Sequence, residues 1–153
     1  MNWDLAFSLT NAVAMAGWVM LAALPRKPLT LSLVLYLCIG LLCLAYFLLF
    51  VALFGNLVDP QRLPGTAKPD LLDYSVAGLR PLFMSDGGIV IGWTHYLAFD
   101  LFVGLWVSRD ADAKGFSRWV QLPVLFLVLM AGPIGLLVWL MVRERRARAA
   151  AND

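Results

Sequence analysis

Charged residues are scarce in this chain: lysine, arginine, aspartate and glutamate make up 14% of its 153 residues, and histidine occurs once. A soluble domain of this length covers much of its surface with charged side chains. Here 61% of the residues are hydrophobic, and the mean hydropathy is +0.79. The composition therefore predicts a single membrane domain over residues 1–153. The net charge of +2 does not indicate a nucleic-acid partner.

Signatures of metal and nucleotide sites are also lacking. One histidine without clustered carboxylates cannot form a zinc or di-iron site, so we expect no metal. No phosphate-binding loop, dinucleotide fingerprint or nucleophile elbow occurs, so we expect no cofactor. The two cysteines, Cys38 and Cys43, lie five residues apart in one apolar run. On a helix they face different directions and cannot form a disulfide bond.

What the chain does contain is four long apolar runs, at residues 5–24, 29–55, 89–108 and 120–142. Each reaches about 20 residues, the length at which a helix crosses the hydrocarbon core of a bilayer. Lipid offers no hydrogen bonds to the backbone, and the runs lack the alternation of membrane strands. The sequence therefore predicts an all-α integral membrane protein, a bundle of four transmembrane helices. A cleaved secretory signal is disfavoured, because residues 1–4 contain no basic residue.

The long connection between the second and third runs contains a segment with helical periodicity, at about residues 70–84. Asp70 can cap a helix there, and Asp73 would lie in its first turn. Apolar residues recur on one side of this segment: Leu72, Val76, Leu79 and Phe83. We expect a short amphipathic helix that lies at the membrane interface and covers one end of the bundle.

Four crossings would place both termini on one side of the membrane. Basic residues cluster after the last run in the sequence RERRAR, residues 143–148. Positively charged segments favour the cytoplasmic side, so we expect both termini there. The same cluster is interpreted as an anchor to lipid headgroups.

The third run contains two ionisable residues, His95 and Asp100. Ionisable side chains inside a membrane helix are costly, and are therefore functional candidates. At about 100° per residue the two lie about 140° apart. They flank a stripe formed by Gly92, Tyr96, Phe99 and Val103.

A carboxyl group in an apolar site favours its protonated form and can donate a proton, whereas a neutral imidazole can accept one. We therefore interpret Asp100 as a catalytic acid and His95 as a base or orienting group. Tyr96 lies one helical turn from Asp100 and can hydrogen-bond to it. A structural clamp, in which both side chains only join helices, is an equally good interpretation of the spacing.

Two other runs contribute candidate positions. Asn11 and Trp18 share a face of the first helix, and Asn11 is a candidate partner for Asp100. Together with Gly92, Tyr96 and Phe99 they are the predicted binding residues. The last run contains AGPIG at residues 131–135, where Pro133 should bend the helix and the glycines permit close contact.

Three segments together resemble one known family: GWTHYLAFDLFVGLWVSRD at 92–110, TNAVAMAGWVMLAALP at 10–25 and AGPIGLLVW at 131–139. They are similar to the neoxanthin-synthase-like, or abscisic-acid-deficient-4-like, family of small four-helix membrane proteins from plastids, cyanobacteria and other bacteria. The resemblance implies that Asn11, Trp18, His95, Asp100 and Gly104 are family positions. Since the chain begins almost directly at its first apolar run, it resembles a bacterial member, and we expect it in the bacterial inner membrane.

The resemblance also implies a chemistry, because the plant member is implicated in converting violaxanthin to neoxanthin, an epoxide-to-allene isomerisation. We therefore expect an isomerase, or a related acid–base enzyme, that acts on a carotenoid or another isoprenoid lipid. The alternative is a non-catalytic carotenoid- or lipid-binding helper subunit of a membrane complex. A transporter is less favoured, since no internal repeat is evident. Membrane lipids are expected partners, and a homo-oligomer is compatible with the sequence.

Overall fold

The computed structural model describes the backbone at residues 1–70 and 72–151, and the side chains of these residues as far as Glu144. The described part of the chain is helical and contains no strand. In chain order the elements are α1 (Trp3–Ala23), α2 (Pro28–Ser32), η1 (Leu33–Ile39), α3 (Gly40–Phe54), α4 (Val76–Phe83), α5 (Asp86–Ala113) and α6 (Arg118–Ala151). The predicted all-α architecture is therefore confirmed.

Four helical segments are long and apolar enough to cross a membrane, at Trp3–Ala23, Pro28–Phe54, Asp86–Ala113 and Arg118–Glu144. These segments coincide with the four predicted runs. A helix begins a few residues before its apolar run where its N-terminal capping residue lies outside that run. For example, α5 begins at Asp86 because the Ser85 side chain accepts a hydrogen bond from the Gly88 N–H (3.1 Å). The second segment combines α2, η1 and α3, and widens into a π-helix over Leu33–Ile39.

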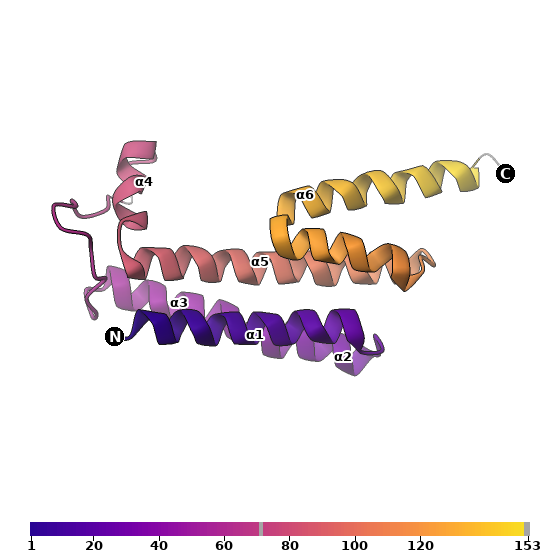
Figure 1. Cartoon of the computed structure of the whole chain (residues 1–153), viewed down its shortest axis with the longest axis horizontal. Coiled ribbons are helices and arrows are strands. Elements are labelled where there is room, and N and C mark those ends of the chain that lie inside the picture. Colours follow the sequence, from indigo (N-terminus) through magenta and orange to yellow (C-terminus); the bar gives the residue numbers. More distant parts are fainter. Residues whose placement is uncertain (71, 152–153) are drawn as a thin grey trace.

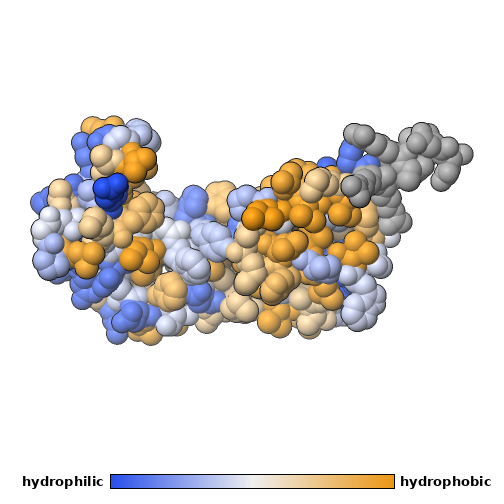
Figure 2. All heavy atoms as spheres, turned by 45° about the horizontal axis from the view of Figure 1, so that its top comes forward, coloured by the Kyte–Doolittle hydropathy of each residue, from blue (hydrophilic) through white to orange (hydrophobic). Residues whose placement is uncertain are grey.

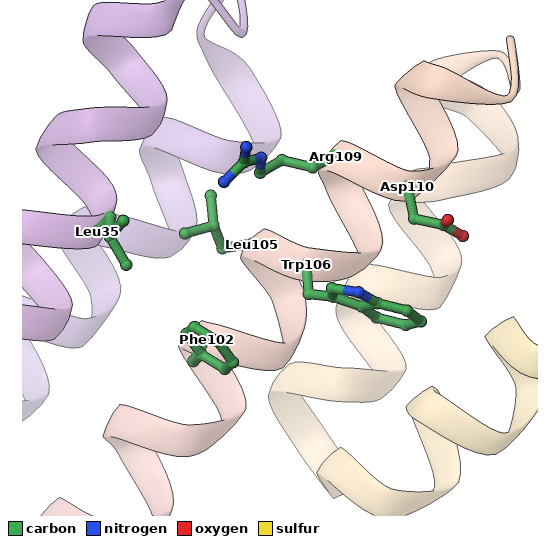
Figure 3. A pocket seen from close by; sticks show the side chains of 6 residues that line it. All are labelled: Leu35, Phe102, Leu105, Trp106, Arg109 and Asp110. Carbon is green, nitrogen blue, oxygen red and sulfur yellow. The ribbon is translucent and has the colours of Figure 1, made fainter.

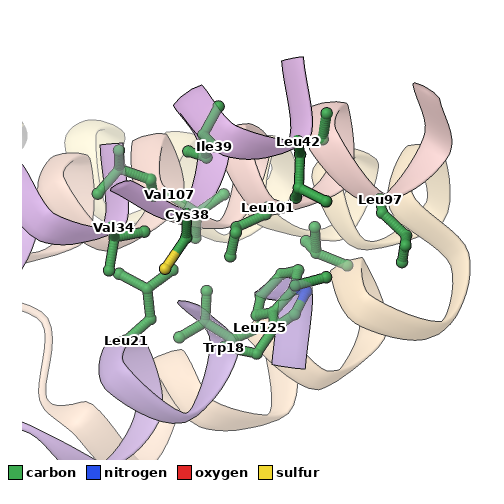
Figure 4. Close-up of a cluster of buried hydrophobic side chains, with 14 of the residues drawn as sticks. Trp18, Leu21, Val34, Cys38, Ile39, Leu42, Leu97, Leu101, Val107 and Leu125 are labelled. Atoms are coloured by element: carbon green, nitrogen blue, oxygen red, sulfur yellow. The ribbon is translucent and has the colours of Figure 1, made fainter. Parts of the chain in front are cut away.

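The central helix of the fold is α5, which packs against α1, α3 and α6. Helices α5 and α1 approach each other closely, because a glycine on each helix faces a large side chain on the other. A β-carbon at Gly17 would lie 2.5 Å from a methyl group of Leu101, and one at Gly104 would lie 2.4 Å from the Trp18 ring. Figure 4 shows the resulting core, in which Trp18 and Leu21 of α1 meet side chains of η1, α3, α5 and α6.

The amphipathic helix between the second and third apolar segments is shorter than predicted. It begins after Ser75, whose side chain accepts from the Gly78 N–H (3.1 Å), rather than at Asp70. The reason is local: Asp70 and Asp73 each accept a hydrogen bond from the backbone two residues on, which forms turns instead of a helix. In Figure 1, α4 stands across the N-terminal end of α5, and its Phe83 packs on Gly92. Its place at a membrane interface stays a prediction.

The last apolar segment reverses direction instead of running straight. At Ala131 the backbone leaves the helical conformation (φ −157°, ψ 73°), and the helix divides into a first arm, residues 118–130, and a second arm, residues 132–151. Near its start the first arm contacts the C-terminal end of α5, through Gln121 Nε2 and Asp112 Oδ1 (2.9 Å). The second arm returns to the same end, where an Arg143 nitrogen lies 2.9 Å from Asp110 Oδ2. Thus α6 is a helical hairpin packed on half of α5 (Figure 1).

This reversal bears on two expectations. The bend predicted at Pro133 is present but begins two residues earlier, at Ala131, and it turns the chain back instead of tilting it. Four crossings would place both termini on one side of a membrane, whereas Figure 1 shows the start of α1 and the end of α6 at opposite ends of the structure. The physical reason is that a hairpin returns the chain to the end from which it came. The side of a membrane on which each terminus lies stays a prediction.

Candidate functional site

The turn of the α6 hairpin lies directly over Asp100, near the middle of α5. Asp100 is 8% exposed, and its Oδ2 atom has no hydrogen-bond partner among the described residues. A β-carbon on Gly132 would stand 2.0 Å from the other carboxyl oxygen, Oδ1. A larger residue at position 132 would therefore have to displace either the Asp100 side chain or the start of the second arm. The result is a buried carboxyl group that is enclosed by the hairpin but only partly hydrogen-bonded.

Tyr96 joins this carboxyl group to the hairpin. Its hydroxyl donates to the Leu129 carbonyl (3.3 Å) and also interacts with Asp100, as the one-turn spacing predicts. Leu129 lies in the last turn of the first arm, where carbonyls have no intrahelical donor once the helix is interrupted at Ala131. The Tyr96 hydroxyl thus satisfies one of these carbonyls while it faces the carboxyl group.

A row of aromatic rings leads along the surface to Tyr96. Trp93 stacks on Tyr96 with centroids 5.1 Å apart, and Phe7 lies 5.8 Å from Trp93. We name Phe7, Trp93 and Tyr96 the aromatic row. Asn11 fixes the middle of the row, because its Oδ1 accepts from the Trp93 indole N–H (3.1 Å) and its Nδ2 donates to the Phe7 carbonyl (2.7 Å).

The face between α4 and the α6 hairpin is hollowed, and Figure 2 shows less hydrophobic side chains there than over α6. At the α4 end Gly92 contacts Phe83, since a β-carbon at position 92 would lie 3.0 Å from that ring. At the other end lie Tyr96 and Asp100 with the hairpin. The structure therefore gathers Asn11, Gly92, Tyr96 and Asp100 along one side of α5.

The remaining predicted site residues lie elsewhere. His95 is exposed and contacts the rings of Tyr46 (5.6 Å) and Phe99 (4.7 Å), on the side of α5 that faces α3. Phe99 is on that side too. The predicted stripe of Gly92, Tyr96, Phe99 and Val103 therefore does not form one continuous binding surface between His95 and Asp100. Trp18 is buried in the core against Gly104, and its indole N–H has no partner among the described residues.

Sequence reasoning missed one contributor, Trp93, and did not predict the partner of another, Gly132. Trp93 could have been found, because it lies three residues before Tyr96, close to one helical turn away on the same side of α5. Gly132 was recognised as a close-contact glycine, but its partner, Asp100, depends on the hairpin. Among the described residues no three His, Cys, Asp or Glu side chains come together at one place. The polar side chains that meet beneath the hairpin are the Asp100 carboxyl group and the Tyr96 phenol.

These features define the class of the chain: a helical protein of membrane type, with a buried carboxyl–phenol pair beneath an interrupted helix. The chain belongs to the ABA DEFICIENT 4-like (ABA4-like) family, whose family model matches residues 5–139. This confirms the resemblance identified from the sequence motifs. Neither the curated proteins nor the solved structures contain a match to the chain.

Proposed function

We propose that this protein is a membrane isomerase that acts by acid–base chemistry on a carotenoid or another isoprenoid lipid. The observation that supports it best is the carboxyl group of Asp100, which is buried, has an unpartnered oxygen and lies at the end of the aromatic row. Family membership supports the lipid class, because the family resemblance implies an epoxycarotenoid such as violaxanthin as substrate.

The proposed reaction opens an epoxide to an allenic alcohol. The acid protonates the epoxide oxygen, a C–O bond breaks, a neighbouring carbon loses a proton, and a new C=C bond forms. The protons balance, since one is given to oxygen and one is taken from carbon. A single carboxyl group can carry out both transfers, with Asp100 as acid and then as base.

In this proposal Tyr96, held by its hydrogen bond to the Leu129 carbonyl, orients the Asp100 carboxyl group. The aromatic row supports the conjugated chain by stacking. Gly92 and Asn11 are proposed binding residues, since Gly92 lets the Phe83 ring pack against α5 at one end of the hollow and Asn11 holds the Trp93 ring. His95 remains the second candidate for the base, although it lies on another side of α5.

The experiment is expression in a host that makes violaxanthin, followed by chromatography of the extracted pigments. The wild-type protein should produce an isomer of unchanged mass. Asp100→Asn should abolish it, while His95→Gln should retain it. An unchanged pigment profile with Asp100→Asn, at equal protein level in the membrane, would remove Asp100 from the reaction.

A second function is favoured by the aromatic row itself: a non-catalytic subunit that holds a polyene for another enzyme. A row of stacked rings binds a conjugated chain whether or not a reaction follows. Turnover by the purified protein alone distinguishes the two. A bound visible chromophore without turnover would favour the helper.

A further inference from the structure

A second elongated site lies on the opposite side of α5 from Asp100. The α5 residues that line it recur at three- and four-residue intervals: Ala98, Phe99, Phe102, Leu105, Trp106, Arg109 and Asp110. At about 100° per residue the middle of this set points about 150° away from Asp100. The site is therefore independent of the carboxyl group under the hairpin.

Three adjoining cavities of about 350, 320 and 310 Å³ form this site between the second apolar segment and α5. Leu35 lines all three cavities, Phe102 lines two and Arg109 lines two, so the cavities lie next to one another. We name them together the Leu35 groove. On the second segment its lining extends from Pro28 to Cys43, which at 1.5 Å per residue is about 22 Å.

The groove has one polar end. Its inner part is lined by apolar side chains and Cys43, whereas Ser32, Tyr36 and Arg109 line the outer part. The π-helix η1 contributes to this shape, because its wider turn keeps Leu35, Ile39 and Cys43 more nearly on one side of the helix. In Figure 3 the Arg109 side chain lies over Leu105 and extends from α5 towards the second segment and its Leu35.

Arg109 lines the groove and has no anionic partner among the described residues, unlike three other cations at this end of α5. Arg26 pairs with Asp112 (2.9 Å), and Lys114 and Arg143 pair with Asp110 (2.8 and 2.9 Å). Asp110 borders the same cavity, but in Figure 3 it points away from the groove. A guanidinium group at the open end of an apolar groove complements a phosphate group attached to a hydrocarbon chain.

We propose that the Leu35 groove binds one anionic phospholipid, with its phosphate on Arg109 and one acyl chain between α5 and the second apolar segment. The length fits, because the groove exceeds the ~15 Å that half of a ~30 Å hydrocarbon core provides. A zwitterionic lipid would bind less well, since its own cation competes for the phosphate. The lipid fills the groove and holds the two helices together at the end opposite α4.

The test is native mass spectrometry of the delipidated, detergent-purified full chain, titrated with phosphatidylglycerol or with phosphatidylcholine. The wild-type protein should bind one phosphatidylglycerol in preference to phosphatidylcholine. Arg109→Gln should weaken phosphatidylglycerol binding about ten-fold and remove the preference. The matched control is Arg80→Gln, which removes an exposed arginine on α4 and should change neither.

A second variant tests the acyl chain. Cys43 is exposed at the apolar end of the groove, so Cys43→Trp should fill that end without disturbing the core. This variant should weaken the binding of both phosphatidylglycerol and phosphatidylcholine, although it keeps the charge of Arg109. Equal phosphatidylglycerol binding by the wild type and Arg109→Gln would overturn the proposal. A second outcome would also overturn it: millimolar inorganic phosphate displaces the lipid, and Cys43→Trp binds the lipid as the wild type does. The phosphate group of the lipid would then account for binding without the acyl chain.

Discussion

Gly132 lies directly on the carboxyl group of Asp100, so that a β-carbon at position 132 would stand 2.0 Å from Oδ1. This contact joins a buried acid to the turn of a hairpin that ends halfway along α5. The position of the carboxyl group and the path of α6 therefore depend on each other. A substitution of either residue should therefore alter the position of the other.

The contact predicts that Gly132→Ala moves the hairpin away from Asp100. The new methyl group meets the carboxyl group, and overpacking of this kind typically costs about 1–3 kcal/mol of unfolding free energy. We expect a lower thermal midpoint in detergent and a loss of isomerase activity.

The matched control is Gly40→Ala, where a β-carbon would meet only the Leu35 carbonyl at an ordinary 3.7 Å. It should leave both properties nearly unchanged. A Gly132→Ala protein as stable and active as the control would contradict the close contact.

The base of the hairpin is held by Asp110. Its carboxylate accepts from the Trp139 indole N–H (3.1 Å) and from Arg143 Nη2 (3.2 Å), and pairs with Lys114 (2.8 Å). Asp110→Asn weakens all three interactions and leaves a buried indole with a poorer partner, so we expect a loss of about 1–3 kcal/mol. Thermal unfolding in detergent measures this, with Asp4→Asn on the exposed start of α1 as the control.

Tyr96 and Trp93 should affect turnover differently. Tyr96→Phe keeps the ring in the aromatic row but removes the hydroxyl that faces Asp100, so kcat should fall by about 10- to 100-fold with little change in KM. Trp93→Ala removes a stacking surface, so KM should rise while kcat changes less. If Tyr96→Phe and Trp93→Ala changed kcat and KM in the same way as each other, the two residues would serve only to maintain the fold.

The hairpin predicts a topology that can be measured in intact cells. If α6 turns back at Ala131, a cysteine at residue 2 and one at residue 150 should be labelled from opposite sides of the membrane by an impermeant maleimide. The background should lack Cys38 and Cys43, and a cysteine at residue 115 should label from the same side as residue 150. Labelling of residues 2 and 150 from one side would show that α6 crosses completely.

Much of the fold could be predicted because it depends on local properties. Length and hydropathy define the four apolar segments, and a one-turn spacing places Tyr96 beside Asp100. The same helical geometry places His95 and Asp100 on different sides of α5, which agrees with their separate surroundings. The start of α4 was predicted too early, since Asp70 and Asp73 form turns with their own backbone.

The rest depends on contacts between distant segments. AGPIG predicts a bend, but its angle is set by Gly132 against Asp100, Gly135 against the Val128 backbone and Arg143 against Asp110. None of these pairs is evident from sequence spacing. For the same reason the sequence did not pair Asn11 with Trp93, because that hydrogen bond joins α1 to α5.

The most direct test of the central claim is single-turnover conversion of an epoxycarotenoid by the purified protein in detergent, with wild type, Asp100→Asn and His95→Gln compared at equal folded concentration. We expect conversion by the wild type and by His95→Gln, and a rate at least about 100-fold lower for Asp100→Asn, as removal of a general acid–base group implies. Conversion by Asp100→Asn at the wild-type rate would contradict the account.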